Sequence, residues 1–329
     1  MTPLLELADL RIAFPGTTGR VRPVDGVSLS IRRGELLALV GESGCGKSLT
    51  SLAILRLVPP PGRIEAGTTL RFDGTDLLAL DPEAMRRVRG RRIGMVFQDP
   101  MTSLNPVHRV GDQIAESARL HLGLSRSAAL DRAVELLDKV GIPRARDRAR
   151  DHPHQFSGGM RQRVMIAIAL ACDPILLLAD EPTTALDVTI QAQILELIAS
   201  ISDEFGTAVI LITHDLGIAA GLCDRISVMY GGRIVESAPT DEIFARPRMP
   251  YTLGLMESIP GVTTIPGQPL RTIDGMPPDL VDPPPGCRFA PRCTHARERC
   301  RAEEPELTGR SAAGHLARCW GTAPGGWIP

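Results

Sequence analysis

Aromatic residues are scarce in this sequence: phenylalanine, tyrosine and tryptophan together make up only 3% of its 329 residues. So small a share argues against a protein that binds single-stranded nucleic acid by stacking bases on aromatic rings. An excess of charge of either sign is also missing, since 37 lysines and arginines stand against 38 aspartates and glutamates. The composition therefore gives no electrostatic reason to expect nucleic acid or an anionic membrane as a partner.

Long hydrophobic runs are missing as well. The longest apolar stretch, VMIAIALACDPILLLA (164–179), is interrupted by Asp173 and Pro174, so it cannot supply the roughly 20 apolar residues of a membrane-spanning helix. The first residues, MTPLLELADLR, include Glu6 and Asp9 and have no basic stretch before an apolar one, unlike a secretory signal. We therefore expect a soluble protein in a reducing cytosol, where disulfides are rare.

Cysteine is rare along most of the chain and concentrated near its end. Only Cys45, Cys172 and Cys223 precede GCRFAPRCTHARERC (286–300). The cysteines of the terminal group are Cys287, Cys293, Cys300 and Cys319. Their spacing, C-x5-C-x6-C-x18-C, lacks the tight C-x2–4-C pair of typical structural zinc sites. Four loosely spaced thiolates suit an iron–sulfur cluster, and zinc or free thiols remain as alternatives.

The periodicity of the chain predicts an α/β fold with a change of character near its end. Continuous apolar runs at 36–40, 175–180 and 208–213 predict buried parallel strands. Helical spacing and stop signals predict helices over 48–58, within 107–150, and over about 159–171 and 190–206. Prolines crowd 247–291 and regular periodicity is lost after about 240. We expect a domain over 1–240 with a helical subdomain at about 100–165, and a small irregular Cys-rich domain over 241–329.

A glycine-rich loop, GESGCGKS (41–48), follows an expected strand and opens an expected helix. In this context the pattern G-x-x-x-x-G-K-[ST] is typical of a phosphate-binding loop, whose backbone N–H groups surround an anion. Lys47 would reach the outer phosphates and Ser48 would hold Mg²⁺. The candidate ATP-binding residues of this region are Gly41, Ser43, Gly44, Cys45, Gly46, Lys47, Ser48 and Leu49. A helix N-terminus can also lower the pKa of a thiol such as that of Cys45.

Two acidic residues end the apolar run ILLLADE (175–181). Carboxylates at the carboxyl end of a parallel strand lie where α/β proteins bind ligands. Asp180 is the candidate Mg²⁺ ligand, and Glu181 is the candidate group that polarises the attacking water. A second anion-binding helix terminus is expected at Ser157–Gly158–Gly159 in FSGGMRQR (156–163). One chain needs one phosphate site, so the second suggests that two chains share their nucleotides.

These motifs, in this order, resemble the ATP-binding-cassette (ABC) ATPases over about 1–240. The resemblance implies a P-loop core with an antiparallel β subdomain and ATP with Mg²⁺ as cofactors. It implies that Gln98 senses Mg²⁺ and couples to a membrane partner, that Asp187 ends the Ala185–Leu186–Asp187 loop beside nucleotide, and that His214 contacts the γ-phosphate. An early aromatic stacks on adenine in the family, and Phe14 is the candidate, with an ordinary strand residue as the alternative. The signature reads FSGGM where LSGGQ is commonest, so only the SGG site is transferred.

Four longer stretches are similar to the dipeptide, oligopeptide and nickel importer ATPases of the DppD and OppD type. They are FQDPMTSLNP (97–106), HPHQFSGG (152–159), PYTLGLMESIP (250–260) and GCRFAPRC (286–293). The resemblance implies an ATPase that powers peptide import, pairs with a second homologous ATPase, and works beneath two membrane permeases fed by a substrate-binding protein. It would lie at the cytoplasmic face of the inner membrane and bind no nucleic acid.

Some members of this family carry a [4Fe–4S] cluster in a similar tail, which favours the iron–sulfur interpretation of the four terminal cysteines. Two alternatives to peptide import stay open at this point. The same machinery can import nickel or another small solute, and a soluble ABC ATPase can act outside transport. The second alternative usually comes with long coiled-coil insertions or two cassettes in one chain, and this sequence has neither.

Overall fold

The structure, a computed structural model, describes residues 2–16, 19–259, 272–309 and 314–328. The last residue of the 250–260 motif lies outside these ranges. The chain forms two compact units that alternate along the sequence. Unit 1 comprises residues 1–2, 32–36 and 79–212, and unit 2 comprises residues 3–31, 37–78 and 213–329.

Unit 1 is built on three parallel strands in the order β9–β8–β7. They are β7 (Ile93–Val96), β8 (Leu176–Asp180) and β9 (Ala208–Thr213). Every residue of β8 and β9 is buried, which explains why their sequences are continuous apolar runs and confirms the prediction for them. The third strand, β7, ends at Val96 and leaves Phe97 and Gln98 exposed beyond it.

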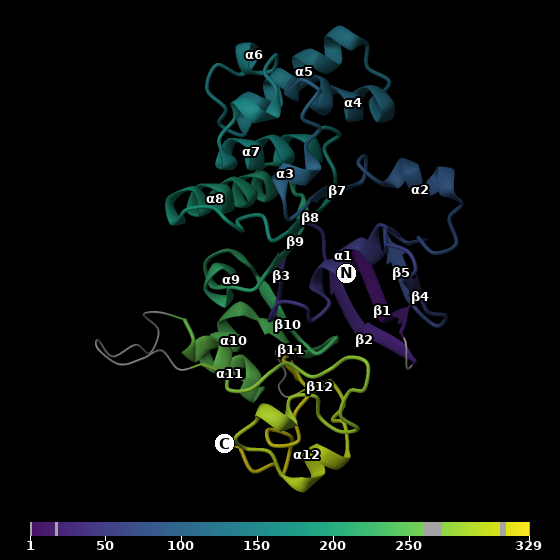
Figure 1. The fold of residues 1–329 in the computed structure, drawn as a ribbon, viewed down its shortest axis with the longest axis vertical. Coiled ribbons are helices and arrows are strands. Elements are labelled where there is room, and N and C mark those ends of the chain that lie inside the picture. The colour runs from purple at the N-terminus through teal and green to yellow at the C-terminus, as the bar shows by residue number, and fades with distance from the viewer. Residues whose placement is uncertain (1, 17–18, 260–271, 310–313, 329) are drawn as a thin grey trace. The chain divides into compact units, whose positions relative to one another are not determined.

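The helices of unit 1 lie mainly between β7 and β9 in the sequence, and Figure 1 shows α4 and α5 side by side. They are α2 (Pro82–Val88), α3 (Pro100–Ser103), α4 (Val110–Leu122), α5 (Arg126–Lys139), α6 (Ala145–Arg148), the 3-10 helix η1 (Pro153–Gln155), α7 (Gly158–Ala169) and α8 (Val188–Phe205). The apolar positions of α5, such as Ala133 and Leu137, are buried, as its helical spacing predicts. The helices expected within 107–150 and near 159–171 and 190–206 are therefore present.

Unit 2 contains an antiparallel sheet in the order β2–β1–β5–β6, with β4 paired to β1. Its strands are β1 (Leu5–Pro15), β2 (Arg20–Ile31), β4 (Arg63–Ile64), β5 (Thr69–Phe72) and β6 (Thr75–Asp76). Buried Leu5 and Leu7 flank exposed Glu6 on β1, the alternation expected of strands with one covered face. The antiparallel β subdomain implied by the family resemblance is thus present.

A second set of strands in unit 2 has the order β12–β13–β11–β10–β3. Its members are β3 (Leu36–Val40), β10 (Arg225–Tyr230), β11 (Arg233–Pro239), β12 (Thr308–Gly309) and β13 (Leu316–Ala317). The strand β3 is parallel to β10 and leads through the Gly41–Ser48 loop into α1 (Lys47–Ile54). This helix ends earlier than the expected 48–58, because the backbone of Arg56 turns to a left-handed φ of 53°.

Residues from 241 onward belong to unit 2 and do not form a unit of their own by their contacts. Besides β12 and β13 they contain α10 (Thr240–Ala245), α11 (Pro250–Glu257), the 3-10 helix η2 (Ala290–Arg292) and α12 (Glu298–Ala302), after α9 (Leu216–Leu222). The fully buried carboxylate of Glu236 on β11 lies 2.6 Å from Nε2 of buried His315. It also accepts hydrogen bonds from the backbone N–H groups of Arg248 and Met249. The Glu236 side chain therefore connects β11 to the segment at 248–249 and to the segment that contains His315.

Candidate nucleotide-binding site

The Gly41–Ser48 loop of unit 2 holds its lysine over its own backbone. Lys47 is 4% exposed, and its Nζ donates to the carbonyl oxygens of Gly41 at 2.8 Å and Glu42 at 3.0 Å. Gly46 has a φ of 105°, and a Cβ at this position would clash with the backbone of β2, so this position requires glycine. The loop therefore places the Lys47 ammonium group and a glycine-containing backbone turn at the start of α1. The helix dipole favours an anion at this position.

Cys45 in this loop does not have the lowered pKa that its place before a helix suggested. Burial of the side chain raises the pKa of its thiol, and the nearby Lys47 ammonium lowers it by less. The thiol sits inside the loop with its Sγ 3.9 Å from Nζ of Lys47. Desolvation disfavours the thiolate more than one cation favours it, so burial opposes the effect that the helix terminus alone would have on this thiol.

In unit 1, Gln98 and Glu181 are brought together at the carboxyl ends of β7 and β8. The amide nitrogen of Gln98 donates to Oε2 of Glu181 at 3.1 Å, and the hydroxyl of Thr184 donates to the same oxygen at 2.8 Å. Glu181 has a left-handed φ of 44° directly after β8, a conformation that costs energy in a non-glycine residue and often marks functional sites. Asp180, the last residue of β8, is 5% exposed.

The SGG motif and the loop before α8 also meet within unit 1. Ser157 caps α7 by accepting a hydrogen bond from a backbone N–H, and Asp187 caps α8 in the same way. A Cβ on Gly159 would lie 2.6 Å from Cγ2 of Ile190, so glycine allows the start of α7 to approach α8 this closely. Ser157 and Gly158 are exposed, and their side of α7 is accessible to a molecule outside this chain.

Two further predicted residues lie in unit 2. His214 follows β9 directly and is exposed, and Asp215 beside it caps α9. Phe14, near the end of β1, is half-buried and lines a hollow of about 640 Å³ together with Arg20, Arg63 and Glu65. A planar ring at the edge of a hollow can stack on a flat ligand.

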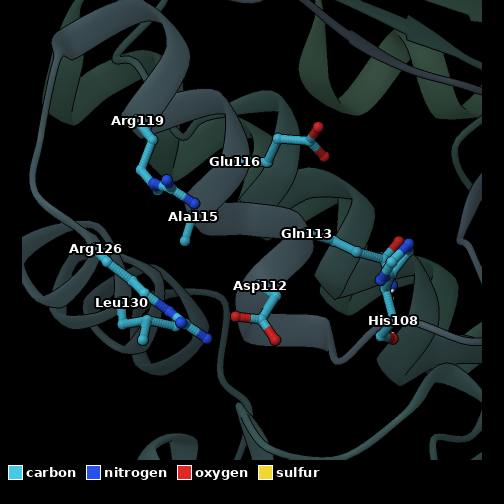
Figure 2. A pocket seen from close by; sticks show the side chains of 8 residues that line it. All are labelled: His108, Asp112, Gln113, Ala115, Glu116, Arg119, Arg126 and Leu130. Atoms are coloured by element: carbon cyan, nitrogen blue, oxygen red, sulfur yellow. Dashed lines mark hydrogen bonds between the residues drawn. The ribbon is translucent and has the colours of Figure 1, made fainter.

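Another hollow, of about 310 Å³, lies on the helical part of unit 1 and contains none of the predicted nucleotide-binding residues. Figure 2 shows acidic side chains of α4 (Asp112 and Glu116) and basic side chains of α4 and α5 (Arg119 and Arg126) around it. The two signs of charge are mixed along its rim, so the hollow offers no net field for a charged ligand.

Comparison with known proteins decides which family these motifs represent. The family described as "ABC transporter" matches residues 24–184, and the family described as "Oligopeptide/dipeptide transporter, C-terminal region" matches residues 235–300. The chain is 51% identical over 321 residues to the oligopeptide transport ATP-binding protein OppD of Bacillus subtilis, which covers 97% of this chain and 89% of the relative. The chain belongs to the ABC transporter ATPases of the oligopeptide and dipeptide type.

Two further relatives agree with this membership. The dipeptide transport ATP-binding protein DppD of Bacillus subtilis is 48% identical over 320 residues, which are 97% of this chain and 95% of the relative. Among solved structures, a dimeric post-hydrolysis state of the ATP-binding cassette MJ0796 with ADP and phosphate matches with a TM-score of 0.65 and 28% identity, over 72% of this chain and 98% of that chain. ATP hydrolysis and the α/β cassette fold expected from the sequence are thereby confirmed.

The structure also shows residues of this ATPase that the sequence reasoning missed. Tyr251 and Arg292, both from the C-terminal part of unit 2, bond to Glu42 of the glycine-rich loop. Both residues stand in stretches that marked the chain as a peptide-importer ATPase, 250–260 and 286–293, but their contact with the loop had no sequence signal. None of the helices in the described part of the chain combines the length and apolar character needed to span a bilayer.

The four terminal cysteines of the ATPase line one cavity in unit 2. It is about 20 Å³ in volume, room for roughly a single water molecule, and its walls include Phe289 and the rings of Trp320 and Trp327. Burial raises the pKa of the Cys287 thiol to about 12, and burial also raises that of Cys293. Within the described ranges, no three His, Cys, Asp or Glu side chains are arranged to hold a metal ion.

Proposed function

We propose that this chain is the ATP-hydrolysing subunit of a transporter that imports di- or oligopeptides. The observation that carries the proposal is the match to the oligopeptide and dipeptide transporter C-terminal region at residues 235–300, beside the ABC match at 24–184. Relatives named for oligopeptide and dipeptide transport align with nearly the whole chain. Intact Lys47, Asp180, Glu181 and His214 support an active ATPase rather than a degenerate one.

In unit 2, the proposed roles centre on the Gly41–Ser48 loop. Its backbone N–H groups and Lys47 bind the phosphates of ATP, with Leu49 at the start of α1 beside them. Phe14 stacks on adenine, and His214 contacts the γ-phosphate. The hydroxyl of Ser48 is a candidate Mg²⁺ ligand. The Lys47 ammonium and the glycine turn at position 46, both at the start of α1, support this assignment, because a helix N-terminus with a nearby cation favours an anion.

In unit 1, the proposed roles centre on the end of β8. Asp180 and Gln98 are candidate Mg²⁺ ligands, and a buried carboxylate at a strand end is the donor that this cation prefers. When bound, Mg²⁺ neutralises charge on the phosphates. Glu181 orients and deprotonates the attacking water, and its hydrogen bonds from Gln98 and Thr184 hold the carboxylate in place for that role.

The Ser157–Gly158–Gly159 motif at the start of α7, with Asp187 near it, is proposed to act on nucleotide held by a second ATPase subunit. Ser157 and Gly158 are accessible at the start of α7, and a solved relative in fold is described as a dimer with ADP and phosphate. A homologous but different ATPase is the proposed partner. The active unit is then a heterodimer in which each chain completes the other's site.

The membrane partners are proposed to contact the region from Phe97 to Val107, which contains Gln98. Three apolar residues stand exposed within eleven positions there: Phe97 is 41% exposed, Met101 65% and Val107 74%. Closely spaced exposed apolar side chains often mark protein contacts. Two permeases covering them would hold the ATPase at the cytoplasmic face of the inner membrane, and a substrate-binding protein would deliver peptide from the other side.

The first test combines the chain with its partners. The isolated ATPase is expected to hydrolyse ATP slowly, whereas the complex with its second ATPase and permeases, in liposomes with the binding protein, should hydrolyse faster when di- or oligopeptide is supplied. Peptide uptake and phosphate release are measured together, with the Glu181→Gln complex as control. Stimulation and uptake with nickel but not with peptide would replace peptide import by nickel import, and full activity of a strictly monomeric chain would refute the shared site.

We further propose that Cys287, Cys293, Cys300 and Cys319 hold a [4Fe–4S] cluster. The donor set fits, because four thiols converge on one cavity with aromatic walls. The cavity itself has room for about one water, so the thiols must move apart when the cluster binds. The cluster would stabilise a region with little regular structure.

Metal analysis tests this proposal directly. Protein purified without oxygen is expected to be brown and to contain about four iron and four acid-labile sulfide per chain. A Cys293→Ser variant should lose most of this iron, while Cys172→Ser, a buried cysteine of unit 1, should keep it. Stoichiometric zinc without iron would show a zinc site instead of a cluster, and metal-free protein would show free thiols. A Cys293→Ser chain that keeps its iron would show that Cys293 is not a ligand.

A further inference from the structure

The segment between Cys287 and Cys293 carries an arginine onto the glycine-rich loop. The guanidinium of Arg292 forms a two-pronged ion pair with Glu42, with Nη1–Oε2 at 2.7 Å and Nη2–Oε1 at 3.0 Å. Its Nε donates to the carbonyl oxygen of Asp274 at 2.9 Å, and Nη2 also donates to that of Ile273 at 3.0 Å. All three nitrogens of the Arg292 guanidinium donate hydrogen bonds, and the side chain is 5% exposed. The orientation of the guanidinium is therefore fixed.

The backbone of Glu42 is held from the same side. Its N–H donates at 2.9 Å to the hydroxyl of Tyr251, which is fully buried. The Tyr251 ring packs 4.5 Å from that of Tyr230 and 5.4 Å from that of Phe289, measured between ring centroids. The Tyr230 hydroxyl accepts a hydrogen bond from Arg292 at 3.3 Å. The side chain of Glu42 therefore bonds to Arg292 and its backbone bonds to Tyr251. Both partners contact Tyr230.

A second arginine of the segment reaches the loop indirectly. Arg288, 6% exposed, donates to the carbonyl oxygen of Gly231 and to the carboxylate of Asp25. Gly231 and Gly232 connect β10 to β11. The N–H of Gly232 donates to the carbonyl oxygen of Cys45 in the glycine-rich loop at 3.1 Å. The same short segment thus braces the loop at two places, three residues apart in the loop sequence.

We infer that Arg292 is a positioning residue for nucleotide binding: its ion pair with Glu42 holds the Gly41–Ser48 loop in its binding conformation and neutralises an acid inside an anion site. The inference rests on the proposed assignment of this loop to the phosphates. A loop ordered in advance loses less conformational freedom when ligand binds, so affinity rises. Without its cation, the Glu42 carboxylate would add an uncompensated negative charge to the loop that is proposed to bind phosphate. The C-terminal region is in this way part of the nucleotide site, although it supplies no atom to the nucleotide.

A double-mutant cycle on the full chain tests the inference. Arg292→Gln and Glu42→Gln are each expected to weaken binding of MgATP, measured by displacement of a fluorescent ATP analogue. Arg292→Gln should raise Kd about tenfold, the loss of roughly one charge-assisted contact, and Glu42→Gln by less. In Glu42→Gln the acid that needs neutralising is gone, so adding Arg292→Gln should then raise Kd by clearly less than tenfold. In the transporter complex KM for ATP should rise while kcat at saturating ATP changes less than about threefold.

Matched variants separate this positioning role from a general disturbance of the C-terminal region. Arg299→Gln breaks an exposed ion pair with Glu303 in the same region and should leave Kd unchanged, while Arg292→Lys should recover part of the affinity. Strictly multiplicative Kd changes, an unchanged Kd in Arg292→Gln, or a parallel fall of kcat would each overturn the inference. Lys47→Ala tests the proposed function separately: normal ATP binding in that variant would refute the assignment of the loop itself, whereas loss of binding there with a normal Arg292→Gln refutes only the role of Arg292.

Discussion

A Glu181→Gln substitution is expected to lower ATP turnover about 100-fold or more while leaving ATP affinity nearly unchanged. Glutamine keeps the shape of the side chain and an oxygen that can accept the hydrogen bonds from Gln98 and Thr184. It cannot take a proton from water, and it lacks the negative charge that polarises water. The chemical step loses its base, whereas the groups that bind phosphate are untouched.

This result is measured as phosphate release by the full transporter complex, with nucleotide affinity determined in parallel. Glu116→Gln is a suitable control, because it makes the same chemical change on α4 of unit 1, in the hollow that holds no predicted nucleotide-binding residue. Near-normal turnover in Glu181→Gln would remove Glu181 from the catalytic role. A loss of affinity as large as the loss of turnover would make it a binding residue instead.

A Gly158→Asp substitution should abolish ATP-driven closure of the ATPase pair and with it almost all hydrolysis. A Cβ at Gly158 has only one neighbour within 4 Å, Cδ2 of Leu186 at 3.8 Å, so the chain itself has room for the new side chain. An acid at the start of a helix even stabilises that helix slightly. The damage arises only when a phosphate from the second subunit approaches the added negative charge.

The neutral variant Gly158→Asn provides the matched control for shape. It should retain considerably more activity than Gly158→Asp, and both chains should unfold at nearly the temperature of the natural one. ATP-dependent association of the two ATPase subunits, followed by light scattering, gives the direct measurement. Equal activity of the aspartate and natural chains would show that this turn does not meet a phosphate. A large drop in unfolding temperature would assign the effect to folding.

The sequence predicted the parts of this fold that depend on local pattern. The buried strands β8 and β9 were recognisable because both faces are covered and every residue is apolar or ends the strand. The helix after the glycine-rich loop was placed correctly but ends at Ile54, since the left-handed turn at Arg56 carries no glycine to announce it. A helix end that is set by the backbone conformation of one residue is therefore poorly predicted from sequence patterns.

The candidate site divides in the same way. Lys47, Glu181 and Ser157 could be identified because their neighbours in the sequence form motifs with a known physical purpose. The partnership of Glu42 with Arg292 spans 250 positions, and no periodicity links them. From the sequence, the only effect expected on the Cys45 thiol was a lowering of its pKa by the helix terminus. Its pKa is instead raised, mainly by burial, which depends on segments far away in the sequence. Contacts of this kind appear only once the chain is folded.

The assembly of unit 2 from three separated stretches has a consequence for how the protein is made. Strand β3 pairs in parallel with β10, with Leu37 opposite Arg225, and β11 pairs with β13, with Glu236 opposite Ala317. A ribosome adds about 5–20 residues per second, so the partner of β3 is translated on the order of ten or more seconds after it. The glycine-rich loop gains its braces from Tyr251, Arg288 and Arg292 later still, and the nascent chain must wait for its last segment before this unit is complete.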